Sequence, residues 1–72
     1  MSKDELRLAC GILGWSYTET AKRIGVTPFA VSKWATGAIR VPNPVTMLLR
    51  KFLEEQGILE DFENLSRKKF GA

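Results

Sequence analysis

The sequence predicts an all-α fold, a small bundle of four to five helices with a helix-turn-helix at its centre. Two observations lead to this prediction: apolar residues recur three and four positions apart along most of the chain, and helix-capping residues interrupt the pattern at short intervals. The 72 residues make one domain, and a chain of this length buries only about 60% of the surface that its unfolded form exposes. We therefore expect modest stability for one copy and a benefit from association with a second.

The first predicted helix follows Ser2. Ser2 and Glu5 have the spacing of a capping box, in which each side chain satisfies a backbone N–H of the first turn. The helix that they open has an apolar stripe made of Leu6, Ala9, Cys10 and Leu13. Because Cys10 is the only cysteine, it excludes an internal disulfide, and its place on the stripe predicts a small buried side chain.

A second helix is expected to begin at Tyr17 and to stop at Gly25. Ser16 and Glu19 repeat the capping-box spacing ahead of it. Glycine at position 25 adopts a left-handed backbone conformation without a steric penalty, and so ends a helix. Ala21, inside this helix, has the small side chain that two steeply crossing helices need where they touch.

A third helix is expected over Pro28–Thr36, close behind the second. Thr27 is its N-cap, proline occupies its first position, where a missing N–H costs nothing, and Gly37 closes it. Val31 and Trp34 lie on its inward side. Its outward side is mixed in character and consists of Phe29, Ser32, Lys33 and Thr36.

The residue types exclude most enzyme chemistry. The chain has no histidine and one thiol, so neither a zinc site of the Cys/His type nor a histidine acid–base pair is available. Ser32 and Lys33 are neighbours on a helix and point about 100° apart, so they cannot share a proton. Trp15 and Trp34 are expected in the core, with base stacking as the alternative. We expect no catalysis, no cofactor and no metal.

The basic charge is concentrated on the helix pair. The net charge is +3; residues 16–40 contain four basic side chains and one acidic, whereas residues 41–72 contain five of each. This distribution favours nucleic acid as a partner, with an ordinary solvated helix face as the alternative. No apolar run reaches the length of a membrane span and the first residues lack the order of a signal peptide, so a cytoplasmic location is expected.

The segment Leu6–Phe52 resembles the Cro and phage-repressor type of helix-turn-helix, the XRE-like family of transcriptional regulators. The similarity lies in GWS at 14–16, alanine at 21, RIGVT at 23–27, VSKW at 31–34 and glycine at 37. It implies a lambda-repressor-like domain whose helix 28–36 enters the major groove of DNA. This sequence departs from the family at Tyr17, where a phosphate-contacting glutamine is usual, and at Pro28 and Phe29, where polar residues are common.

On this interpretation, one group of side chains reads bases and another contacts phosphates. Lys33 is expected to donate to guanine N7 or O6, and Phe29 to lie against a thymine methyl. The base-reading group is Pro28, Phe29, Ser32, Lys33 and Thr36. The phosphate-contacting group is Tyr17, Lys22, Arg23, Thr27 and Arg40.

Residues 44–66 are predicted to form a fourth and a fifth helix that contribute to dimerisation. Asn43 is the expected N-cap, and the fourth helix runs from Pro44 to about Gln56. A short fifth helix is expected to end before the basic RKK tail. The apolar residues cover a wider arc than one core contact requires, so they either meet a second copy or form a lid on their own chain. The expected dimer interface consists of Leu49, Phe52, Leu53, Ile58, Leu59, Phe62 and Leu65.

The sequence therefore predicts a sequence-specific DNA-binding regulator, most simply a homodimeric repressor of a palindromic operator, often its own promoter. Two recognition helices held about 34 Å apart would read successive major grooves. The proline-marked stretch 41–55 is similar to the dimerisation helix of small phage-type regulators, including anti-CRISPR-associated autorepressors, and of some antitoxins. The alternatives are a protein-interaction module, which an outward Phe29 favours, and an antitoxin-type DNA-binding partner of another protein. No small-molecule ligand is expected.

Overall fold

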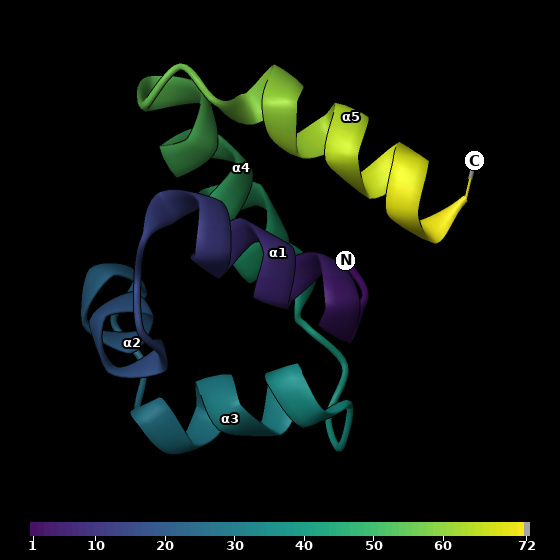
Figure 1. Cartoon of the computed structure of the whole chain (residues 1–72). Helices are drawn as coiled ribbons and strands as arrows, with labels where there is room; N and C mark the ends of the chain where they lie inside the picture. The colour runs from purple at the N-terminus through teal and green to yellow at the C-terminus, as the bar shows by residue number, and fades with distance from the viewer. Residues whose placement is uncertain (72) are drawn as a thin grey trace.

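The computed structural model describes residues 1–71, which form five α-helices and no strand (Figure 1). The helices are α1 (Lys3–Leu13), α2 (Tyr17–Ile24), α3 (Pro28–Thr36), α4 (Asn43–Glu55) and α5 (Leu59–Phe70). In Figure 1, α1 lies in the middle of the molecule, with α3 on one side of it and α5 on the other. The predicted all-α fold is confirmed.

Local capping signals set the beginnings of α1 and α2. Ser2 Oγ accepts a hydrogen bond from the Glu5 backbone N–H at 3.1 Å, and Glu5 Oε1 accepts one from the Ser2 N–H at 3.0 Å, so this capping box is complete. Ser16 Oγ accepts from the Glu19 N–H at 3.0 Å. The Glu19 carboxylate pairs instead with Arg23 at 2.6 Å, so the second box is only half formed.

Helix α3 has the bounds that the sequence predicts. Thr27 Oγ1 accepts a hydrogen bond from the Ala30 N–H at 3.2 Å, which satisfies one of the otherwise unpaired donors of the first turn. Glycines at positions 25 and 37 end α2 and α3 with φ angles of 80° and 82°, in the left-handed region where a glycine has no Cβ penalty. These signals are local, so they can be recognised in the sequence without knowledge of the rest of the fold.

Two expectations about the C-terminal half are wrong. Helix α4 begins one residue early, because the N–H groups of Val45 and Thr46 bond to the Pro42 carbonyl; Pro42 is the N-cap and Asn43 is already helical. The basic residues 67–69 are no tail, since they form the last turn of α5. Cations in this turn interact favourably with the unpaired carbonyl groups at the end of a helix.

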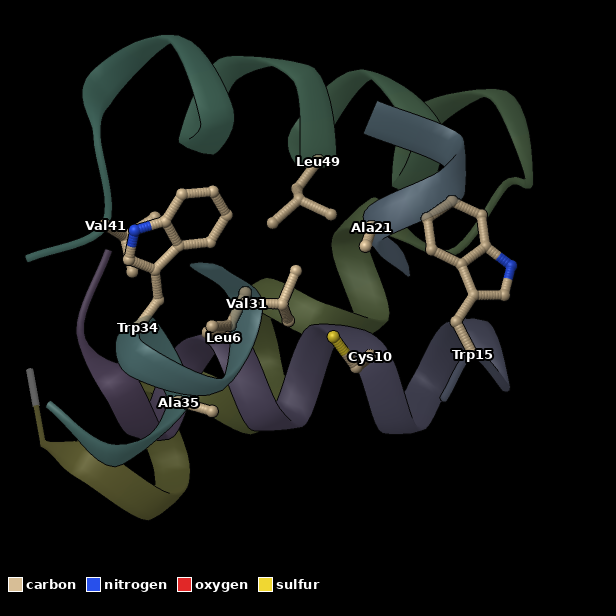
Figure 2. Close-up of a cluster of buried hydrophobic side chains, with 9 residues drawn as sticks. All are labelled: Leu6, Cys10, Trp15, Ala21, Val31, Trp34, Ala35, Val41 and Leu49. Atoms are coloured by element: carbon tan, nitrogen blue, oxygen red, sulfur yellow. The ribbon is translucent and has the colours of Figure 1, made fainter. Parts of the chain in front are cut away.

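The main core cluster fills the space between α1, α3 and α4 (Figure 2). Trp15 and Trp34 both lie in it, as predicted, and the Trp15 ring packs edge-on against Phe52 at 5.0 Å between centroids. Cys10 is buried there, and burial raises the pKa of its thiol. The cluster consists of Leu6, Cys10, Trp15, Ala21, Val31, Trp34, Ala35, Val41 and Leu49.

A second cluster joins α5 to α1 and α4, and it corrects the predicted dimer interface. Leu53 and Phe62 meet Ala9 in this cluster, with exposed fractions of 0% and 1%, and Leu49 in the main cluster is also at 0%. Three of the seven predicted interface residues are therefore enclosed by their own chain and cannot contact a second copy. The alternative prediction, a lid over the same chain, describes α5.

The lid forms within one chain because the connection between α4 and α5 is short. The chain reverses through Gly57, at a φ of 74°, and a short loop has a small closure entropy to overcome. Two polar contacts add to the apolar packing: Ser66 Oγ donates to Glu5 Oε2 at 2.8 Å, and Arg50 pairs with Glu63 at 2.9 Å. Of the four remaining predicted interface residues, Leu65 is exposed. The other three are half-buried, namely Phe52, Ile58 and Leu59.

Candidate nucleic-acid interface

Helices α2 and α3 form a compact pair joined by the three residues 25–27. Figure 1 shows α2 nearly end-on and α3 lying across the view, so the two helices cross steeply. Ala21 on α2 is 1% exposed and packs in the main cluster with Val31 of α3, as the small side chain predicted. The N–H groups of Gly25 and Val26 both bond to the Ala21 carbonyl at 2.9 Å, which closes the turn.

The outward side of α3 presents the predicted base-reading residues together on one helix. Phe29 is 69% exposed, an unusual position for an aromatic ring in a chain with so little core. Lys33 is half-buried, and the others are open to solvent, namely Pro28, Ser32 and Thr36. Helix α3 carries no carboxylate, so nothing on it repels a polyanion.

Phe29 and Lys33 are coupled on this surface. The Lys33 Nζ lies 4.9 Å from the centroid of the Phe29 ring, a cation–π distance between residues one helical turn apart. The ring thus limits the directions in which the ammonium group points. Sequence reasoning treated the two residues as independent contacts, although their i, i+4 spacing was the available signal.

Two of the hydroxyl groups among the predicted contact residues already form hydrogen bonds within the chain. Thr36 Oγ1 donates to the Lys33 carbonyl at 3.2 Å, so toward a ligand it offers lone pairs and a methyl group. Thr27 Oγ1 accepts from the α3 backbone and keeps its own proton for donation. The Ser32 hydroxyl has no hydrogen-bond partner among the described residues, so it is free to donate or accept.

Four of the five predicted phosphate-contacting residues are exposed and carry no ion pair within residues 1–71. Tyr17 stands at the first position of α2 and Thr27 at the N-cap of α3, so both lie at helix N-termini, where backbone N–H groups attract anions. Lys22 is exposed on α2 and Arg40 in the connection between α3 and α4.

Arg23, the fifth predicted phosphate contact, is engaged elsewhere. Its Nε lies 2.6 Å from Glu19 Oε2, and its guanidinium carbon lies 5.1 Å from the centroid of the Trp15 ring. Its charge is balanced locally and its direction is set by α2 and by the ring. Of the phosphate-contacting group, Arg23 is thus the least available to a ligand.

Lys3 joins this surface from the start of the chain, which sequence reasoning missed. Its side chain passes over the end of α3, where Lys3 Cδ lies 3.0 Å from the position that a Cβ on Gly37 would occupy. Lys3 and Arg40 line the same hollow beside Trp34 and Ile39. No sequence pattern connects residue 3 with residue 40, because only the packing of α1 against α3 brings them together.

Residues 1–71 contain no group of three or more Cys, His, Asp or Glu side chains placed to hold a metal ion. None of their helices combines the length and the apolar character needed to cross a bilayer.

Comparison of the chain with protein-family models, with curated proteins and with solved structures gives no match.

Proposed function

We propose that this protein is a sequence-specific regulator of transcription that binds double-stranded DNA through α3. The observation that carries the proposal is the outward face of α3, where an apolar ring, a hydroxyl and an ammonium group stand together without a carboxylate. The major groove is wide enough to admit an α-helix, and it displays the acceptors, donors and methyl groups that such a face can read.

Each exposed group has a role in this proposal. Lys33 donates to guanine N7 or O6, Ser32 donates or accepts at a neighbouring base edge, and Phe29 packs on a thymine methyl. Tyr17 and Thr27 bind phosphates beside the N-termini of α2 and α3, and the cations Lys22, Arg40 and Lys3 bind phosphates nearby. The phosphate contacts set the position of the helix on the duplex and the salt dependence, whereas the base contacts set the sequence.

The regulatory output that we propose is repression by a homodimer bound to an inverted repeat. One recognition helix covers only a few base pairs, so two copies are needed for useful specificity. Occupation of a promoter by the bound dimer is the simplest way for such a DNA-binding domain to act.

A binding titration tests the proposal. Fluorescence anisotropy of the DNA upstream of the protein's own coding sequence, and of a scrambled duplex, is measured at two salt concentrations. Lys33→Ala should weaken binding to the preferred duplex about 5- to 150-fold and leave scrambled DNA nearly unchanged. Arg40→Ala should weaken both duplexes alike and reduce the salt slope by about one unit.

Lys51→Ala is the matched control, because Lys51 is an exposed lysine on α4, outside the proposed surface, and its removal changes the net charge equally. It should leave binding to the preferred duplex unchanged. Equal losses on every sequence from Lys33→Ala and Arg40→Ala would reject the division into base and phosphate contacts.

A second candidate function is a protein-interaction module, which the 69% exposure of Phe29 favours, since exposed aromatic rings often anchor protein contacts. An antitoxin-type role would combine such a contact with DNA binding. Absence of DNA binding at low salt, with Phe29→Ala abolishing capture of a protein partner, would favour the module over the regulator.

A further inference from the structure

One face of α5 stays open after α5 has packed on its own chain. We call it the α5 strip: its members are Asp61, Asn64, Leu65 and Lys68, and together with Ile12 of α1 they line a hollow between α5 and α1. Leu65, in the middle of the strip, is 39% exposed although its neighbour Phe62 is fully buried. The strip therefore has an apolar centre with one charge at each end.

The charges of α5 are segregated along its length. Its first turn carries Glu60 and Asp61, and its last turn carries three basic residues, 67–69. On the α5 strip, Asp61, Leu65 and Lys68 follow the i, i+4, i+7 spacing of one helix face. Neither Asp61 nor Lys68 forms an ion pair within the described part of the chain.

Such a strip is complementary to itself. If a second copy lies antiparallel, with a twofold axis between positions 64 and 65, Asp61 of each copy faces Lys68 of the other, and the two Leu65 side chains meet near the axis. A partner of a single charge sign would be repelled by one end of the strip, because the ends are opposite. The opposite charges at the two ends of the strip therefore favour a second copy of this chain as the partner.

We propose that two copies of this protein pair through the α5 strip, with antiparallel α5 helices and two symmetry-related Asp61–Lys68 contacts. This pairing would supply the dimer that the proposed regulator needs. Its biological purpose therefore rests on the proposed function. Helix α1 lies between α5 and α3 (Figure 1), so pairing at the strip leaves the outward face of α3 uncovered in both copies.

Sedimentation equilibrium of the full chain without DNA tests the pairing. Asp61→Lys and Lys68→Asp each turn two attractive contacts into two repulsive ones, so either variant alone should self-associate at least about tenfold more weakly than the wild type. An equimolar mixture of the two variants should regain association, because each reversed charge then faces an opposite one. Met47→Lys, at a 70% exposed position on α4, is the control and should pair like the wild type.

Recovery in the mixture distinguishes a lost contact from a lost fold, since two misfolded variants cannot restore each other. A wild-type chain that stays monomeric at millimolar concentration, single variants that pair normally, or a mixture without recovery would each overturn the proposal. The measurement contains no DNA, so a failure of pairing leaves DNA binding to be decided by the anisotropy titration.

Discussion

Replacing Phe62 by alanine tests whether α5 belongs to the fold of a single chain. The Phe62 ring is 1% exposed and lies in the cluster with Ala9 of α1 and Leu53 of α4. Removing a buried phenylalanine side chain costs about 3–5 kcal/mol, from lost transfer free energy and from the cavity left behind. A domain of 72 residues has a total free energy of unfolding of roughly 4–11 kcal/mol. The substitution should therefore remove about a quarter of it or more.

Urea unfolding followed by far-UV circular dichroism, at two protein concentrations tenfold apart, measures this loss. Phe70→Ala is the matched control, because it makes the same change in the same helix at a position that is 44% exposed, and it should cost less than about 1 kcal/mol. The loss at Phe62 should be the same at both concentrations, since the contacts lie within one chain. If the Phe62→Ala variant has wild-type stability at the lower concentration, this reasoning is refuted and Phe62 belongs to an interface between copies.

Two further predictions concern α1 and its neighbours. Hydrogen bonds from the Ser2 backbone and the Ser66 hydroxyl lower the pKa of Glu5, so its stabilisation is present near neutral pH and is lost as the pH falls through the folded-state pKa. Glu5→Gln should cost about 1 kcal/mol in thermal unfolding at pH 7 and almost nothing near pH 2; a pH-independent difference would contradict this. Gly25→Ala should destabilise the fold by about 1 kcal/mol, because the Gly25 φ of 80° strains an alanine even though the space around it is open. Gly11→Ala, inside α1, should stabilise the fold by up to about 1 kcal/mol. Equal changes in the midpoint of thermal unfolding for the two variants would contradict this backbone argument.

Part of the candidate interface followed from helical spacing alone. The positions of Val31 and Trp34 on one side of α3 required Phe29 and Ser32 to lie on the other, and the structure places them so. The i, i+4 spacing offered Glu19 as a partner for Arg23, but it did not reveal the contact with the Trp15 ring, because Trp15 precedes α2 and meets the guanidinium group only in three dimensions.

The sequence by itself determined where the helices lie. Serine and threonine caps, a proline at position 28 and glycines after α1, α2 and α3 act through hydrogen bonds and backbone angles within a few residues, so they predicted the ends of α3 without any knowledge of the fold. Only the tertiary structure decided which surfaces the apolar residues cover. A helical stripe shows that a face becomes buried, but burial removes the same area from water whether the covering helix belongs to the same chain or to another copy. The short connection through Gly57 resolved that choice for Leu53 and Phe62, and the packing of α1 against α3 brought Lys3 to the candidate interface.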